Sequence, residues 1–488
     1  MNKNRQIISE LKDFFKHNDA SRAINAVNNV MERLVIQAKT VGPVKNPNCK
    51  FTFVQLVKLL VVLPFFSVKT AADYADSALG KLFSCKKDSF YRLMDDGRID
   101  WRRIIYSINR QLIGLISRRA DAKGNTRYVI LDDTDLPKRG MKAEGLGKVF
   151  SHTAMKCILG FKAMFLCYTD GKTQLMVDAT IQAESGKDAS KPQGLTKKQK
   201  DAQYGKERGE DEKINTRKEE MLQSKIANAI KMLRLAIVEG LRFDYLLVDS
   251  GFPCAELLQF IHGRRFKCHV IGMIKMGKTK YDTTDGAMTA NAIIAKELKR
   301  KNHVKYSRHY RFYYCEVAAI FAGTPIKLFF YRNGKKGEWN ALLSTNTARG
   351  AYEAYKIYSR RWAIEVSFAE AKRLLNLGKC QCRDFASQIA SISLCMLQYN
   401  TLGYVKRYES YETIGGVFRD VTQASVELTV TEKIYGILMG ALQTIAEAFH
   451  FNKDEMMRAI INNNNNNNNN NKELNAVRRP FESLQLAA

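Results

Sequence analysis

The sequence predicts an α/β protein with several domains, in which a mixed sheet carries the chemistry and helical regions lie at both ends of the chain. Two strand-like apolar runs end in carboxylates, and a β-rich stretch separates the second of them from a helix with a polar stripe. With 488 residues the chain is too long for one hydrophobic core, and its 45% apolar content is enough to fill several.

Residues 1–124 are expected to be helical, because apolar residues recur there at three- and four-residue spacing, as in AINAVNNVMERLVIQA and WRRIIYSINRQLIGLISRR. Arg and Lys are abundant in these helices. They favour a DNA-binding domain, and the alternative is a helical domain whose charges form only a solvated face.

Residues 125–255 change to strand-like texture. RYVILDDTD, CILGFKAMFLCYT and QLMVDATIQA predict three strands, the last two forming a hairpin, and a helix then leads into the fourth strand, FDYLLVDSGF. Between the hairpin and that helix, residues 186–218 are charged and poor in apolar residues, which predicts a surface loop or an arm that DNA orders.

The remaining boundaries follow from further changes in composition. Residues 256–349 are expected to form an inserted β-rich subdomain, 350–405 the second part of the core, and 406–461 a helical region that pairs subunits or covers the core. Ten consecutive asparagines, 462–471, predict a linker before a tail at 472–488.

The charge balance points to a polyanionic partner. Lys and Arg number 78 against 49 acidic residues, a formal net charge of +29, which favours nucleic acid first and an anionic membrane surface second. The longest apolar run, 51–66, is interrupted by Lys58 and Pro64 and is too short to cross a bilayer. The N-terminus shows no signal-peptide pattern, so we expect a cytoplasmic protein.

The two strands that end in carboxylates place Asp133 and Asp249 as neighbours at one edge of the sheet. In YSRRWAIEVSFAEAK, helical spacing puts Tyr358, Arg361, Glu365 and Lys372 on a stripe about 60° wide. Three carboxylates held together repel one another unless a cation joins them, and two Mg²⁺ ions would satisfy them while clamping a phosphodiester. For the helix alone, a surface ion pair between Arg361 and Glu365 is the simpler interpretation.

A family resemblance favours the site. The spacing Tyr-x2-Arg-x3-Glu-x6-Lys resembles the YREK signature of cut-and-paste insertion-sequence transposases, which have an Asp-Asp-Glu (DDE) active site in a ribonuclease-H-like fold. Asp132-Asp133-Thr134 and the run Asp249 to Phe252 are similar to that family's first two acidic motifs. The resemblance spans about residues 125–405 and implies a ribonuclease-H-like core of bacterial origin, associated with the nucleoid.

Carried over to this sequence, the resemblance makes Asp133, Asp249 and Glu365 the metal ligands for two Mg²⁺, with Mn²⁺ as a substitute. Tyr358, Arg361 and Lys372 would hold the backbone of the transposon end. Strand alternation alone would let Asp132 face the metal in place of Asp133. In similar transposases an aromatic residue of the insertion stacks on a flipped base, and Trp339 is the residue we expect in that role.

The sequence therefore predicts a DNA transposase that binds terminal inverted repeats and acts on double-stranded DNA, both transposon ends and target. The resemblance also implies a homodimer in a synaptic complex. Three alternatives stay open: a structure-selective nuclease on the same core, a catalytically inactive DNA-binding descendant, and a basic RNA-binding protein whose strand-end carboxylates are accidental.

Overall fold

The computed structural model describes Val35 and residues 50–422, with gaps at 67, 69, 75–76, 78–79, 81–84, 187, 189, 264–266 and 410. What the sequence predicts for most of the first 49 residues, for 423–461, for the asparagine run and for the tail lies outside the described residues. The chain divides into two compact units. The larger unit, Leu34–Val61 with Asp88–Arg407, contains every residue discussed below as part of the site.

The smaller unit includes Val62–Lys87 and the chain from Tyr408 onward. Its described part contains the short helix η1 (Leu63–Phe66), where Phe65 is buried and meets the ring of Phe418 edge to face at 6.1 Å. The apolar run that leads into it forms α4 (Phe53–Val62), whose buried residues confirm a core helix. No helix in the described residues is long and apolar enough to cross a membrane.

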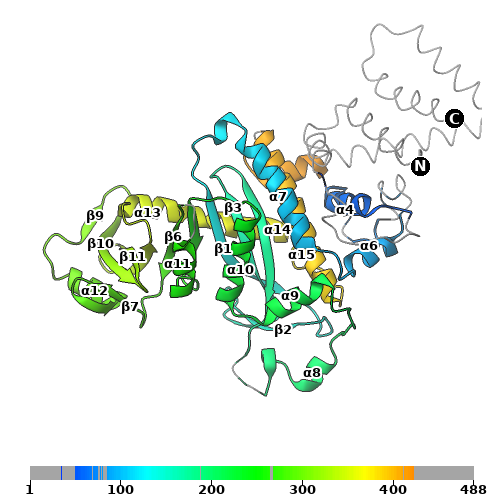
Figure 1. Ribbon diagram of the computed structural model, residues 1–488, viewed down its shortest axis with the longest axis horizontal. Helices are drawn as coiled ribbons and strands as arrows, with labels where there is room; N and C mark the ends of the chain where they lie inside the picture. The colour runs from blue at the N-terminus through cyan, green and yellow to red at the C-terminus, as the bar shows by residue number, and fades with distance from the viewer. Residues whose placement is uncertain are drawn as a thin grey trace, which may run out of the picture. The chain divides into compact units, whose positions relative to one another are not determined.

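A mixed sheet forms the centre of the larger unit (Figure 1). Its core strands run in the order β4-β3-β1-β5-β6; β1, β5 and β6 are parallel, and β3 and β4 are antiparallel to their neighbours. This order confirms the expected mixed α/β core, with the hairpin β3–β4 on one side of β1 and parallel strands on the other. The bounds are β1 (Tyr128–Pro137), β2 (Gly147–Ser151), β3 (Lys156–Thr169), β4 (Gln174–Gln182), β5 (Tyr245–Val248) and β6 (His269–Ile274).

Helices cover both faces of this sheet, which is why its central strands are apolar in nearly every position. On one face α14 (Trp362–Leu374) packs on β1, and the ring of Phe368 lies 5.3 Å from that of Phe165 on β3. On the other face α9 (Lys213–Leu222) and α10 (Lys225–Val238) contact β4. The long helix α15 (Phe385–Tyr408), buried through most of its length, ends the larger unit.

Helices of the expected N-terminal domain belong to the larger unit, among them α7 (Trp101–Ser117) and all but the first residue of α6 (Lys87–Met94). Helix α7 contacts β4, where Tyr106 donates to Asp178 at 2.8 Å and Asn109 donates to the carbonyl of Met176 at 3.0 Å. A short turn, η2 (Ala120–Ala122), leads to β1. The expected domain boundaries stay predictions.

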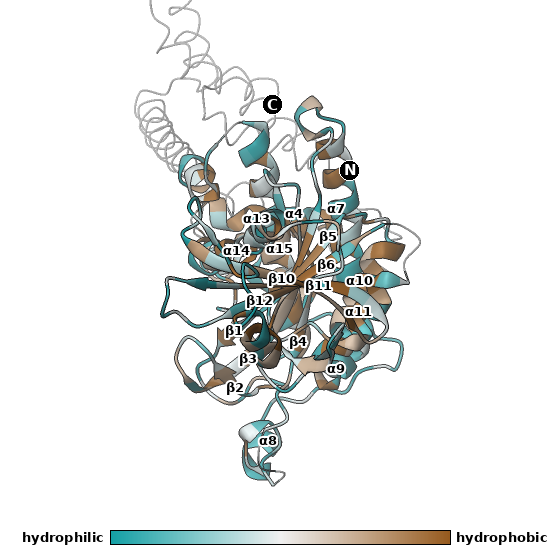
Figure 2. Ribbon diagram, turned by 90° about the vertical axis from the view of Figure 1, so that its left-hand side faces the viewer, coloured by the Kyte–Doolittle hydropathy of each residue, from teal (hydrophilic) through white to brown (hydrophobic). Residues whose placement is uncertain are grey.

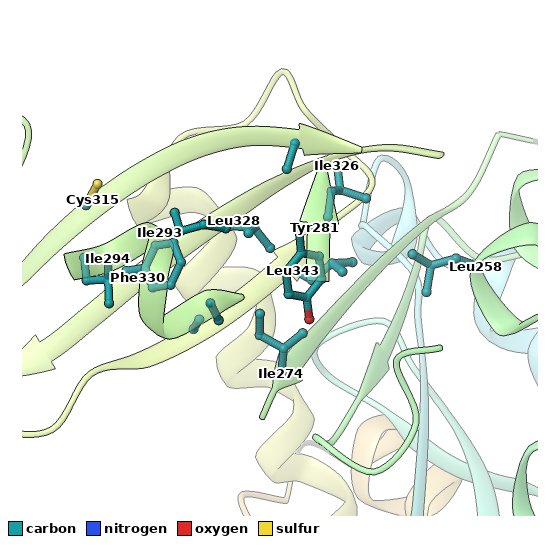
Figure 3. Close-up of a cluster of buried hydrophobic side chains, with 13 residues drawn as sticks. Leu258, Ile274, Tyr281, Ile293, Ile294, Cys315, Ile326, Leu328, Phe330 and Leu343 are labelled. Carbon is teal, nitrogen blue, oxygen red and sulfur yellow. The ribbon is translucent and has the colours of Figure 1, made fainter. Parts of the chain in front are cut away.

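The inserted β-rich stretch continues the same sheet beyond β6. Strand β12 pairs antiparallel with β6, and β11, β10, β7 and β8 follow in order, with β9 on β10. Buried side chains from these strands and α12 form a second apolar core, in which Ile293, Phe330 and Leu343 meet (Figure 3). The bounds are β7 (Lys280–Thr283), β8 (Gly286–Thr289), α12 (Ala290–Glu297), β9 (Lys305–Ser307), β10 (Phe312–Phe321), β11 (Thr324–Asn333) and β12 (Asn340–Ser344).

The charged stretch 186–218 is folded in its described residues, where a surface loop or a DNA-ordered arm was expected. It contains η3 (Pro192–Gly194), α8 (Lys197–Asp201) and most of α9, and α8 begins with a capping box between Thr196 and Gln199. Buried ion pairs and backbone hydrogen bonds hold this segment, and most of its described residues are exposed, as a surface segment requires. Its ordering by DNA stays a prediction. In Figure 2, α8 stands out as a hydrophilic projection beyond β2 and α9.

Candidate active site

The carboxyl ends of β1 and β5 meet at one edge of the sheet. Leu131 pairs with Val248 in the parallel ladder, so the next residue on each strand is an aspartate, Asp132 on β1 and Asp249 after β5. Neighbouring strands lie about 4.8 Å apart. The register therefore brings Asp132, and not Asp133, level with Asp249.

Strand alternation sends Asp132 and Asp133 to opposite faces of the sheet. Asp132 accepts a hydrogen bond from Arg361 at 2.7 Å on the α14 side, and two residues later Thr134 accepts one from Lys372 at 2.7 Å. Asp133 instead forms an ion pair with Lys225, the first residue of α10. The structure thus brings Asp132 and Glu365 together on the α14 side, with Asp249 near enough for its charge to act on Asp132, and places the side chain of Asp133 on the other side.

Arg361 is the cation that the acidic residues share. Its guanidinium reaches Asp132 through one amino group and Glu365 through the other, at 2.7 and 2.5 Å. Burial raises the pKa of Asp132 to about 6; Arg361 opposes this shift, and the nearby charges of Asp133 and Asp249 add to it. A centre with this much negative charge favours a bound cation.

The four residues of the polar stripe do not lie on one straight helix. Helix α13 (Ala351–Tyr358) ends at Tyr358, a 3-10 turn, η4 (Ser359–Arg361), follows, and α14 begins at Trp362. A 3-10 turn advances about 20° more per residue than an α-helix, so three residues turn Tyr358 by about 60° relative to Glu365. Tyr358 is accordingly buried, with the guanidinium of Arg361 5.8 Å from its ring centre.

The other stripe residues remain at the site. Glu365 is partly exposed, and Lys372 is half-buried against β1, where burial lowers the pKa of its ammonium group. The predicted DNA contacts of Tyr358, Arg361 and Lys372 stay predictions.

Trp339 lies away from this stripe, in the inserted part of the sheet. It packs against the second apolar core, and the guanidinium of Arg332 lies 4.7 Å from its ring centre (the core is shown in Figure 3). An indole covered in this way has to lose Arg332 before a base can stack on it. Its predicted role in base stacking stays a prediction.

Two residues that the sequence did not single out help to hold the acidic loops. The ammonium of Lys225 pairs with Asp133 and lies 4.0 Å from the ring centre of Phe252, which follows Asp249 by three residues. Gly272 of β6 leaves room for the same loop, since an added Cβ would lie 2.8 Å from Pro253 and 2.6 Å from Val248. A lysine at a helix start carries no sequence signal for such a role.

Carboxylate oxygens are the ligands that Mg²⁺ prefers, so the residues present suit a divalent cation. Among the described residues, however, no three His, Cys, Asp or Glu side chains are arranged to hold a metal ion. Arg361 occupies the place between Asp132 and Glu365 instead. Metal binding at these carboxylates would require Arg361 to release at least one of them.

Two family models match parts of the chain. Residues 76–287 match the family described as DDE superfamily endonuclease, and residues 221–401 match the family described as transposase DDE domain. Asp132 and Asp249 lie within the first matched range, and Asp249 and Glu365 lie within the second.

Among solved structures, the chain resembles the piggyBac transposase in a cryo-EM structure of its synaptic complex with hairpin DNA. The identity is 11% and the TM-score 0.43, over 86% of this chain and 79% of that one. A search of curated proteins found no match.

Proposed function

We propose that this DDE domain protein is a DNA transposase that binds terminal inverted repeats, cleaves the transposon ends and joins them to target DNA. The observation that supports the proposal is that Asp132 on β1 and Glu365 on α14 share the guanidinium of Arg361, while Asp249 follows β5 level with Asp132 in the parallel ladder. An ordinary surface ion pair would not need two neighbouring strand ends and a helix from the far side of an insertion.

In the proposed reaction the three carboxylates would hold two Mg²⁺ ions, or Mn²⁺ in their place. The bound ions would supply a Lewis acid and an activated oxygen nucleophile for phosphoryl transfer. Asp132 takes the place that the family resemblance gave to Asp133, because the strand register and the contact with Arg361 put Asp132 beside Asp249 and Glu365.

The cationic residues would position the DNA. Arg361 presents a planar fork that matches a phosphate group, and it would be available to DNA once released from the carboxylates. Lys372, which donates a hydrogen bond to Thr134 on β1, would add a second positive charge for the DNA backbone. The buried ring of Tyr358 would help to position Arg361, whose guanidinium lies 5.8 Å from its centre.

Cleavage of the donor DNA that flanks the gene tests the proposal. Purified wild-type protein with Mg²⁺ is expected to make defined breaks at the inverted repeats, and Glu365→Ala is expected to bind the same DNA without cutting it. Breaks without joining to a target would favour the structure-selective nuclease. Binding without cutting by both proteins, in Mg²⁺ and in Mn²⁺, would favour the inactive DNA-binding descendant.

A further inference from the structure

A group of exposed cations lies beyond the end of β1, on the segment that connects β1 to β3 and on the neighbouring α8 segment. We name it the hairpin surface. Its members are Arg139, Lys142, Lys148, Lys156, Lys197 and Lys198. All six are exposed, and none forms an ion pair with another described residue. Figure 2 shows α8, which carries two of them, projecting from the sheet.

The hairpin surface has few internal counter-charges. Glu144 is the only acidic residue between Lys138 and Thr169, and it is buried and already shared by Arg208 and Lys218 at 2.6 and 2.7 Å. On α8 itself a single acid, Asp201, accompanies three lysines. Positive charges in such excess repel one another, so the surface favours an external anion.

Charged residues elsewhere in the larger unit behave differently. In the inserted strands, Asp285 pairs with both Lys296 and Arg300, and on α13 Glu353 pairs with Arg349 at 2.7 Å. The inserted part also carries exposed lysines without an ion pair to a described residue, Lys278, Lys280, Lys299 and Lys301, but it contains paired acids among them. The hairpin surface differs because all six of its cations are unpaired within the described residues.

The segments that carry these cations are fixed to one another. Arg208 joins Glu144 to Asp384 with all three side chains buried, and its bond to Asp384 measures 2.7 Å. The amide of Tyr204 donates to the carbonyl of Lys142 at 2.8 Å, and Gln203 donates to that of Leu146 at 2.8 Å. An anion that meets this surface meets a preformed arrangement, which lowers the entropy lost on binding.

The distance along β1 from Asp132 to the start of the hairpin surface can be estimated from the strand. Strand β1 runs five residues from Asp132 to Pro137, about 17 Å at the usual rise per residue, and Arg139 follows directly. A DNA duplex advances about 3.4 Å per base pair along each strand, so this distance corresponds to roughly five base pairs. A duplex with one phosphate at the carboxylates can extend along β1 to the hairpin surface.

We propose that the hairpin surface binds the sugar-phosphate backbone of a DNA duplex, about five base pairs from the phosphate held by Asp132, Asp249 and Glu365. The inference deepens the proposed function and rests on it for the place of the scissile phosphate. The surface supplies affinity and register and has no part in the chemical step, because its cations contact phosphates that do not react.

The experiment measures binding to a labelled inverted-repeat duplex without divalent metal, at several NaCl concentrations. The test variant replaces four members of the surface with glutamine: Arg139, Lys142, Lys148 and Lys156. The matched control replaces four exposed lysines of the inserted strands, Lys278, Lys280, Lys299 and Lys301, and so changes the net charge equally. Circular dichroism and thermal melting establish that both variants fold.

The test variant is expected to bind at least tenfold more weakly than wild type at 150 mM NaCl. Its plot of log Kd against log salt should be shallower by about 3.6, because each of the four lost phosphate contacts removes about 0.9 from the slope. The control should stay within about twofold of wild type. A charge-keeping variant, with Arg139 changed to Lys and the three lysines changed to Arg, should bind as wild type does.

A second measurement tests the spacing. Duplexes are shortened stepwise on either side of the cleavage position, and the difference between wild type and the test variant should disappear when fewer than about five base pairs remain on one side. Equal losses in the test variant and the control, or a wild-type affinity and slope in the test variant, would overturn the proposal. Binding is read without cleavage, so a protein that binds through this surface but never cuts would refute only the proposed function.

Discussion

The two faces of strand β1 both carry aspartates, but these aspartates have different partners. On the α14 face, Asp132 and Thr134 contact Arg361 and Lys372, two cations that the proposed reaction would turn toward DNA. On the α10 face, Asp133 contacts Lys225, and Asp135 lies 3.7 Å from Lys162. An alternating strand thus separates the acid that the proposed reaction would use, Asp132, from acids paired with lysines on the other face, although they are adjacent in the sequence.

The largest expected effect separates the neighbouring aspartates. We expect Asp132→Asn to lower the cleavage rate by about 1000-fold, about 4 kcal/mol of transition-state stabilisation, because it would remove a metal ligand. Asp133→Asn should lower it by only about tenfold. Single-turnover cleavage at saturating DNA measures both, and the reverse ranking would show that Asp133 faces the metal in the active enzyme.

Arg361 tests whether the α14 face serves the substrate. We expect Arg361→Met to slow cleavage by about 100-fold and Arg361→Lys by less, because lysine keeps the charge but lacks the planar fork. The measurement is cleavage rate against DNA concentration at fixed Mg²⁺. If Arg361→Met cuts at the wild-type rate, the arginine only neutralises the empty carboxylates.

Substitution of Lys225 tests whether its contacts on the α10 face of β1 affect the cleavage rate. Lys225→Met should slow cleavage by about tenfold, since the loop that carries Asp249 would lose its contact with the lysine through Phe252. Lys225→Arg should recover most of the rate. A purely structural role would lower the melting temperature of Lys225→Met and leave the cleavage rate of the folded protein unchanged.

Glu220 on α9 should affect stability with little effect on chemistry. It is buried, and although burial opposes ionisation, Arg217 and Arg102 lower its pKa to about 2. Its pKa in the folded protein is below the usual 4.5, so its contribution to stability is complete above about pH 4.5 and is lost as the pH falls toward 2.

Glu220→Gln should therefore lower the free energy of unfolding by about 3 kcal/mol at pH 7, because it leaves buried arginines without their partner. The difference from wild type should shrink below pH 4.5. Urea unfolding at pH 7 and pH 3 measures it, and Ser224→Ala, at the start of α10, serves as a control without a charge change. An equal difference at both pH values would contradict the assignment.

Much of the site could be predicted from the sequence, for physical reasons. Asp249 and Glu365 were found because a buried strand ending in an acid and a helix with a polar stripe are local patterns. The choice between Asp132 and Asp133 depended on which face α14 covers, a tertiary fact that strand alternation leaves open. Lys225 and Gly272 gave no signal, because their roles arise only when α10 and β6 pack beside β1 and β5.

The fold, like the site, could be predicted only in part from the sequence. The core strands and their hairpin followed from apolar runs and turn signals, and the mixed sheet is as expected. Those patterns did not predict the order of the strands across the sheet or the short strand β2. The polar stripe was drawn on a continuous helix, and the 3-10 turn at Ser359–Arg361 that interrupts it was not expected. Tyr358 still lies beside Arg361, whose guanidinium is 5.8 Å from its ring centre. The packing of α7 on β4 was missed, since an amphipathic helix does not specify its partner.

The pairing of β12 with β6 makes the inserted strands an extension of the catalytic sheet. A rigid ladder of hydrogen bonds therefore joins the insertion to β5, the strand that ends at Asp249. DNA bound by the inserted strands would therefore be attached to the same continuous sheet that carries Asp249. A pull on that DNA would reach Asp249 as a load on the sheet, without a hinge between them to absorb it.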